Sequence, residues 1–144
     1  MQTLFIVQGP SGSGKSTFAE ALEKSWPSLM ICCTDDYFVN CQTGEYKFDP
    51  SKLAENHLKN QEQAAKYLRE GYSVIVPNTN LQNWEVRPYV QVADEYDIPV
   101  VFVRMTGQFN NLHGVPEDKV KLMRERMEEL TVEKALVAKA PWEK

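Results

Sequence analysis

The sequence predicts an α/β fold in which a parallel sheet of about four short strands is covered by helices on both faces. Short apolar runs alternate along the chain with longer amphipathic segments, the pattern of a parallel sheet with crossover helices. The first apolar run leads directly into a glycine-rich turn and then into a helical segment. A length of 144 residues suits one hydrophobic core, so we expect residues 1–144 to form a single domain.

The first third of the chain contains two predicted strands and one helix. Leu4–Gln8 forms the first strand, and the helix is expected from near Lys15 to about Ser25, where Trp26-Pro27 ends it. Residues 29–33 predict a second buried strand, because the run is too short and too apolar for a helix. The polar residues 34–50 predict a loop.

The middle of the chain repeats this order. Asp49-Pro50-Ser51 opens a long amphipathic helix that ends at Gly71. Ser73–Val76 predicts the third strand, and residues 83–96 predict a helix in which Pro88 indicates a late start or a kink.

The last third of the chain completes the sheet. Residues 99–104 predict the fourth strand, and residues 106–115 predict a polar loop that we interpret as a lid. Pro116 suits the first position of a helix that runs to about residue 130, and Thr131 is a suitable cap for one more short helix.

Composition limits the partners and the compartment. With a net charge of -4 and a pI of about 5.2, no global field attracts polyanions, although an enzyme acting on one nucleic-acid end needs only a local basic patch. The first apolar run is too short for a signal peptide or a membrane span, so we expect no membrane partner. Three cysteines are an odd number without metal-ligand spacing, which favours reduced thiols in a cytoplasmic protein.

A phosphate-binding motif follows the first strand. Residues 9–16, GPSGSGKS, match G-x-x-x-x-G-K-[ST] at every fixed position, between a strand and a helix as this P-loop motif requires. Its glycines allow backbone N–H groups to surround a phosphate, Lys15 can reach the β- and γ-phosphates, and the Ser16 hydroxyl can ligate Mg²⁺. The motif therefore predicts ATP with Mg²⁺, and the expected phosphate contacts are Gly12, Ser13, Gly14, Lys15, Ser16 and Thr17.

The acceptor of the phosphoryl group is expected at the same edge of the sheet, because ligands of open α/β sheets bind beyond the carboxyl ends of the strands. Asp35 or Asp36 follows the second strand and is a natural general base for a hydroxyl, although such a pair can equally cap a loop. The expected acceptor contacts are Asp36, Tyr37, Asn78, Asn80, Arg104 and His113.

Several motifs resemble the kinase domain of phage 5′-hydroxyl polynucleotide kinases and their smaller P-loop relatives. The motifs are the P-loop followed by Asp35-Asp36-Tyr37, then FDPSKL at residues 48–53, NTNL at 78–81 and HGVP at 113–116. The resemblance implies a three-layer P-loop kinase fold, ATP-Mg²⁺ as donor, Asp35 as the base and the 5′-hydroxyl of RNA or DNA as acceptor.

The sequence departs from that family at two places. No acidic residue stands beside Asn78, where Pro77 precedes it, and the lid at residues 106–115 contains no arginine to stabilise the transferring phosphoryl group. Arg124 is our candidate replacement as a catalytic residue, with Arg104 as the alternative, whereas Arg126 fits a solvated helical face.

Other polar and aromatic residues allow more than one interpretation. His57 fits a partly buried helical surface, the aromatics that follow the second strand either stack on an acceptor or anchor their loop, and Trp84 and Trp142 fit packing roles. Two other functions remain open: a kinase for a small metabolite, nucleoside or modified base, which the acidic pI suits, and an ATP-binding regulatory module with little turnover.

Overall fold

The computed structural model describes residues 1–40, 42–108 and 114–143. Its four parallel strands form one sheet in the order β2-β3-β1-β4, which confirms the predicted α/β class. The strands are β1 (Leu4–Gln8), β2 (Leu29–Ile31), β3 (Ser73–Val76) and β4 (Val100–Arg104). The helices are α1 (Lys15–Ser25), α2 (Leu53–Arg69), α3 (Asn83–Glu95), α4 (Glu117–Glu125) and α5 (Val132–Val137), with 3-10 turns η1 (Thr34–Phe38) and η2 (Pro50–Lys52).

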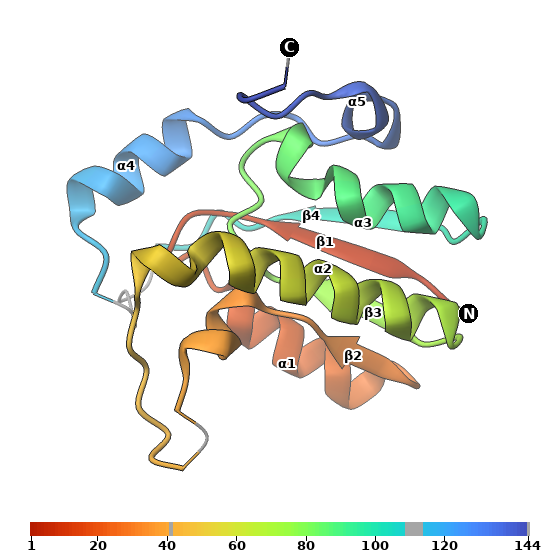
Figure 1. The fold of residues 1–144 in the computed structure, drawn as a ribbon, viewed down its shortest axis with the longest axis horizontal. Coiled ribbons are helices and arrows are strands. Elements are labelled where there is room, and N and C mark those ends of the chain that lie inside the picture. The colour runs from red at the N-terminus through yellow and green to blue at the C-terminus, as the bar shows by residue number, and fades with distance from the viewer. Residues whose placement is uncertain (41, 109–113, 144) are drawn as a thin grey trace.

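Helices cover both faces of the sheet, so the fold has three layers (Figure 1). Alternate residues of β1 point to opposite faces: Leu4 and Ile6 join the core under α2, α3 and α5, whereas Phe5 and Val7 join the core under α1. The apolar runs of β1 and β3 are buried throughout, as a strand covered on both faces requires.

The carboxyl ends of three strands are tied together. The N–H of Gly9, directly after β1, donates to the carbonyl of Thr79, directly beyond β3 (3.0 Å), and Met105 N–H, beyond β4, donates to the Gln8 carbonyl (2.7 Å). These bonds hold the loops that follow the strands at one edge of the sheet.

Two predicted boundaries are wrong and a third is confirmed. Strand β2 ends at Ile31 rather than at residue 33. Helix α3 starts at Asn83 as predicted, without a late start, because Gln82 and Glu85 form a capping box ahead of Pro88. Helix α4 ends at Glu125 rather than near residue 130. The residues after it do not continue the helix: the Glu128 N–H donates to the Leu81 carbonyl (2.8 Å) and not to a carbonyl of α4.

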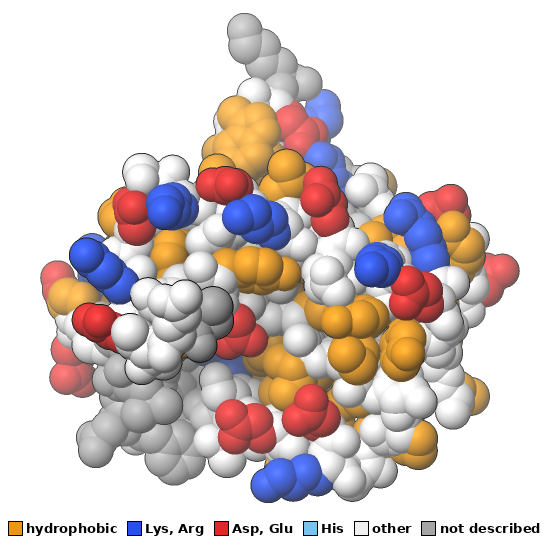
Figure 2. Space-filling model, turned by 60° about the horizontal axis from the view of Figure 1, so that its bottom comes forward, with side chains coloured by type: hydrophobic (Ala, Val, Ile, Leu, Met, Phe, Trp, Pro, Cys, Tyr) orange, Lys and Arg blue, Asp and Glu red, His pale blue; other side chains and the backbone are white. Residues whose placement is uncertain are grey.

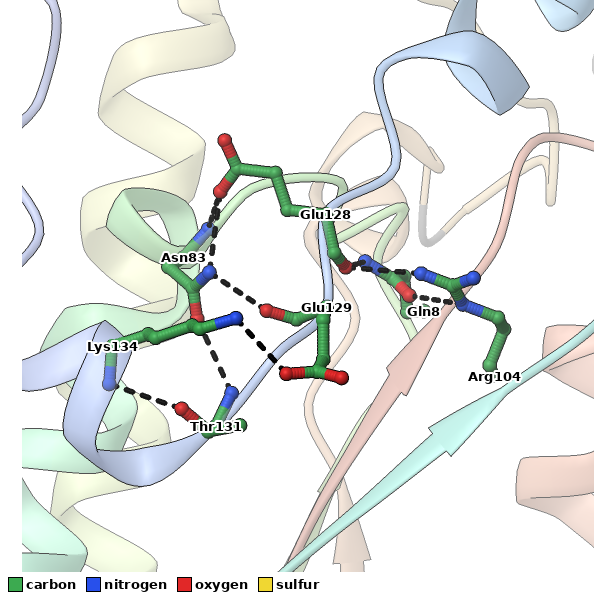
Figure 3. Close-up of polar contacts among 7 residues, drawn as sticks. All are labelled: Gln8, Asn83, Arg104, Glu128, Glu129, Thr131 and Lys134. Atoms are coloured by element: carbon green, nitrogen blue, oxygen red, sulfur yellow. Dashed lines mark hydrogen bonds and ion pairs between the residues drawn. The ribbon is translucent and has the colours of Figure 1, made fainter.

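The segment after α4 is held against β1 and α3 by a polar network (Figure 3). The Glu128 carbonyl accepts hydrogen bonds from Gln8 Nε2 (2.7 Å) and from the Arg104 guanidinium (3.1 Å). The Glu128 carboxylate accepts from the N–H of Asn83 (2.9 Å) at the start of α3. After this segment, Thr131 caps α5 through its Oγ1, as predicted.

Charged side chains of both signs are intermixed on the surface. Figure 2 shows Lys and Arg side chains interspersed with Asp and Glu over the face that it draws, with hydrophobic side chains between them. Within the described part of the chain, no helix has the length and apolar character needed to cross a membrane.

Candidate active site

The loop between β1 and α1 has the geometry that the P-loop motif predicts. Gly12 and Gly14 adopt left-handed φ angles of 81° and 97°, which a residue with a side chain rarely adopts. A Cβ atom at Gly9 would lie 2.4 Å from Ser13 Oγ and 3.1 Å from the Met105 carbonyl oxygen. The glycines are therefore required by backbone conformation at two positions and by crowding at a third.

This loop fits a group of phosphates. Ser13 Oγ is buried and has no hydrogen-bond partner among the described residues, and Gly14 gives α1 no side-chain cap for its first N–H groups. Ser16 and Thr17 are exposed in the first turn of α1. Among the described residues, no group of three or more His, Cys, Asp or Glu could hold a metal. The Ser16 hydroxyl is the group of this loop that would ligate Mg²⁺ together with phosphate oxygens.

Lys15 folds back over its own loop. Its ammonium group donates to the Pro10 carbonyl (2.8 Å). Burial lowers the pKa of Lys15 to about 8, although the nearby Asp35 carboxylate opposes this shift. A buried ammonium that lacks a full counter-charge would gain from a bound triphosphate.

Asp35 lies in the 3-10 turn η1 that follows β2, at the same edge of the sheet. The turn is fixed to the neighbouring strand because the Thr34 N–H donates to Asn78 Oδ1 (2.9 Å). The Thr34 hydroxyl is also 3.2 Å from His57 Nδ1 of α2. Burial lowers the pKa of His57, and the Asp35 carboxylate opposes this shift as it does for Lys15. The partly buried Asp35 is thus near both the P-loop lysine and His57 of α2.

The asparagines that follow β3 have structural partners. Asn80 is 2% exposed with a left-handed φ of 47°, and its amide donates to the carbonyls of Val7 (2.7 Å) and Val76 (3.0 Å). Both amide hydrogens of Asn80 are engaged in joining β1 to β3, which gives Asn80 a structural role, and its predicted contact with an acceptor stays a prediction. Asn78 is partly buried and positions η1 through Thr34.

The candidate arginines occupy different environments. Arg104 pairs with Gln8 in the sheet, and its guanidinium donates to Gln8 Oε1 (2.9 Å) and to the Glu128 carbonyl (Figure 3). These bonds direct Arg104 to the segment after α4. Arg124 is exposed in the last turn of α4, which stands beyond the sheet at the end where the P-loop lies (Figure 1).

The remaining predicted acceptor contacts lie in η1 or outside the described residues. Asp36 and Tyr37 are exposed in η1 beside Asp35. His113 and half of the predicted lid, residues 109–113, lie outside the described residues. The aromatics near Tyr37 include a packed pair, Phe38 and Phe48, with ring centroids 5.1 Å apart, which supports the loop-anchoring interpretation for these two.

A pocket of about 630 Å³ lies between α2 and α3 and reaches the loop after β3. We call it the α2–α3 pocket. Its lining includes Asn78, His57, Tyr89 and Glu85, together with both tryptophans that the sequence assigned to packing. Trp84 and Trp142 do pack, with ring centroids 5.2 Å apart, but they also form the wall of this pocket. Sequence reasoning missed the pocket, and it also missed that an acidic residue, Glu85, shares a cavity with Asn78.

The sheet covered by helices on both faces, together with the P-loop, defines a protein with a P-loop kinase fold. A profile of the AAA domain family matches residues 4–107, which include the P-loop and all four strands, so the chain belongs to this family. The predicted likeness to P-loop kinases of the polynucleotide kinase type is confirmed at the level of the fold.

Relatives of known sequence are similar over most of this chain. It is 37% identical to human NEDD4-binding protein 2 over 133 residues, covering 85% of this chain and only 7% of that much longer protein. It is 28% identical over 127 residues to an uncharacterised Pasteurella multocida protein, covering 80% of this chain and 70% of the relative.

Solved structures share the fold at low identity. The Pnkp1/Rnl/Hen1 RNA repair complex contains a chain with a TM-score of 0.59 and 23% identity, over 94% of this chain and 43% of that one. The Mycobacterium tuberculosis APS kinase CysC has a TM-score of 0.54 and 18% identity, over 87% of this chain and 96% of that one. A gluconokinase from Sinorhizobium meliloti has a TM-score of 0.51 and 17% identity, over 88% and 75%.

Proposed function

We propose that this protein is a kinase that transfers the γ-phosphoryl group of ATP to a hydroxyl. The observation that carries the proposal is the placement of Asp35 at the edge of the sheet where the P-loop lies. There its carboxylate is close enough to Lys15 and His57 to oppose the lowering of their pKa values by burial. A carboxylate beside the phosphate-binding lysine can accept the proton of a hydroxyl that attacks the γ-phosphorus.

Each residue of the site has one task in this reaction. The P-loop backbone and Lys15 hold the β- and γ-phosphates, and Ser16 and Thr17 complete the donor site from the first turn of α1. Mg²⁺ at Ser16 would neutralise charge that develops on the phosphate oxygens. Asn78 and His57 hold η1 through Thr34 and so orient Asp35.

The leading acceptor is the 5′-hydroxyl end of RNA or DNA. The sequence motifs support it, and so does the likeness to a chain of an RNA repair complex. Arg124 is the candidate for stabilising the transferred group, since α4 stands at the P-loop end of the molecule (Figure 1). We assign residues 1–144 to one kinase domain with residues 106–115 as its lid.

The test is transfer of labelled γ-phosphate to a 5′-hydroxyl oligonucleotide, with DNA and RNA in parallel. Asp35→Asn should reduce kcat by about 10²–10⁴-fold while ATP binding is retained. Glu45→Gln is the matched control, because it removes an exposed carboxylate from the same loop. Arg124→Ala in the same assay should lower kcat with little change in ATP affinity.

Two results would contradict the proposal. Unchanged transfer in Asp35→Asn would remove Asp35 as the base, and ATP binding without transfer to any hydroxyl would favour a regulatory module. The absence of arginine from the lid sequence is the observation that keeps that second function open.

A further inference from the structure

The α2–α3 pocket leads to the proposed base. Asn78 and His57 both line it, and both also contact Thr34, the residue before Asp35. A compound that fills the pocket would therefore bring a hydroxyl to the edge where Asp35 lies. A volume of about 630 Å³ is in the range of sites for small molecules.

One wall of the pocket consists of two aromatic rings in contact. The Trp84 indole N–H donates to Gln82 Oε1 (2.8 Å), and the Trp84 and Trp142 rings meet edge to face at 78°. Trp142 is nonetheless 74% exposed, so much of its apolar ring faces solvent. A flat ring that stacks on this wall would remove that apolar area from water.

A third aromatic side chain, Tyr89 of α3, lines the pocket between the two helices. Tyr89 is 2% exposed, and its hydroxyl accepts a hydrogen bond from Asn60 Nδ2 of α2 (2.8 Å). This bond joins the two helices on which the pocket is built, so the space between them is preformed.

The charges around the pocket do not suit a phosphate. Arg87 is its one arginine or lysine among the described residues, and the Arg87 guanidinium is bonded to the Glu143 carboxylate and the Ala138 carbonyl. Glu85 adds a carboxylate, whose pKa is raised by burial. Burial also lowers the pKa of His57, which favours the neutral imidazole. A phosphate in this pocket would meet carboxylates and no uncompensated cation.

We propose that the α2–α3 pocket binds the acceptor through one uncharged planar ring of the nucleoside class, stacked at Trp84 and Trp142, with no phosphate of the acceptor bound there. The inference rests on the proposed kinase function and specifies its substrate. The acceptor site then binds only the terminal nucleoside of a nucleic acid. A free nucleoside is therefore phosphorylated nearly as efficiently as the 5′ end of an oligonucleotide.

Chain length is the first test. The kcat/KM for transfer is compared among adenosine, adenosine 3′-monophosphate and a 5′-hydroxyl hexanucleotide, each at two salt concentrations. We expect the three values to agree within about threefold and to vary little with salt, because acceptor phosphates contribute no contacts. A hexanucleotide preference of about 100-fold that weakens with salt would overturn the proposal, since it requires bound phosphates.

Substitution of the aromatic wall is the second test. Trp142→Ala should raise KM for adenosine and for the hexanucleotide about tenfold with little change in kcat, whereas Trp142→Phe should retain most of the stacking. Tyr96→Ala is the control, since Tyr96 is an exposed aromatic at the opposite end of α3 from Trp84. An equal rise in KM from Tyr96→Ala, or none from Trp142→Ala, would contradict the proposal.

Direct binding separates this inference from the kinase function. Adenosine should quench tryptophan fluorescence without ATP, Trp142→Ala should weaken the binding about tenfold, and ribose should give no quenching. Adenosine binding with no transfer to any acceptor would support the pocket and reject the kinase. Transfer to the hexanucleotide without adenosine binding would support the kinase and reject the pocket assignment.

Discussion

The site has two halves, the phosphate-binding loop and the α2–α3 pocket, and they are formed by different parts of the residues. The phosphate-binding half consists of consecutive residues and uses mostly backbone, with Gly12 and Gly14 in left-handed conformations. The α2–α3 pocket is assembled from side chains of α2, α3, the loop after β3 and the last residues of the chain. Substitutions in the first half therefore act through backbone geometry, with Lys15 as the exception. Substitutions in the second half act through the identity of a side chain.

The largest effect expected within the phosphate-binding half is the loss of the partly buried Lys15 ammonium. Lys15→Ala should weaken ATP binding and reduce transfer by roughly 10²–10³-fold, because it removes the charge that faces the phosphates. The free energy of unfolding should not fall. Burial lowers the pKa of Lys15 to about 8, which means that the charged ammonium destabilises the folded state relative to the unfolded state. ATP titration and urea unfolding measure the two effects.

The exposed Lys24 in the last turn of α1 provides the control. Lys24→Ala should change neither ATP affinity nor transfer. If Lys15→Ala retains wild-type ATP affinity, the phosphates are bound elsewhere.

A smaller effect is expected where the two halves meet. Asn80→Ala should lower the free energy of unfolding by about 3 kcal/mol, because the carbonyls of Val7 and Val76 lose their donor and alanine must adopt a positive φ. Asn80→Gly should recover about 1 kcal/mol of this by relieving the φ strain alone. Chemical denaturation of the three proteins gives the comparison.

A loss of transfer in Asn80→Gly at low temperature, with the fold intact and ATP still bound, would support the predicted contact between Asn80 and the substrate hydroxyl. Because both amide hydrogens of Asn80 are already used, this contact would fall to Asn80 Oδ1, which accepts a hydrogen bond. The structural role derived from its two hydrogen bonds would then be incomplete.

The phosphate-binding half could be predicted from sequence because its signal is local. Lys15 as the first residue of α1 was expected from one motif, and β1 and β3 match their predicted residues. Asn80 was assigned to the acceptor because asparagine is polar and follows a strand, a description that fits a strand-joining residue equally well. Trp84 and Trp142 are distant in sequence, and nothing local indicates that they form one wall.

The crowding of Gly9 tests whether the phosphate-binding half depends on space as well as on conformation. Gly9→Ala should cost about 2 kcal/mol of stability or displace the loop, since its Cβ would lie 2.4 Å from Ser13 Oγ. Gly44→Ala is the matched control, because Gly44 has a φ of 72° and no atom within 4 Å of its Cβ position. It should cost about 1 kcal/mol and leave ATP affinity unchanged.

Thermal unfolding and ATP titration of both glycine variants separate the two causes. If Gly9→Ala binds ATP as tightly as Gly44→Ala does, the loop accommodates a methyl group. Close contact between Gly9 and Ser13 would then be unnecessary for phosphate binding.

The smallest effect is a pH dependence confined to the phosphate-binding half. The pKa of Lys15 in the free protein is lowered to about 8, so its ammonium fraction falls as the pH rises above that value. A bound triphosphate favours the ammonium form and raises this pKa, so binding above pH 8 requires proton uptake. The ATP association constant should therefore fall about fivefold between pH 8 and pH 9, as measured by calorimetry in two buffers of different ionisation enthalpy.

Lys15→Arg sharpens this experiment, because a guanidinium stays protonated and should give weaker but pH-independent binding in that interval. Adenosine binding at the α2–α3 pocket should also be flat from pH 8 to pH 9, since its wall is aromatic and Lys15 does not line it. A flat ATP profile in the wild type would mean that the Lys15 pKa is not lowered in the free protein. The two halves would then respond alike to pH. They would differ only in that one binds its ligand mainly through backbone groups and the other through side chains.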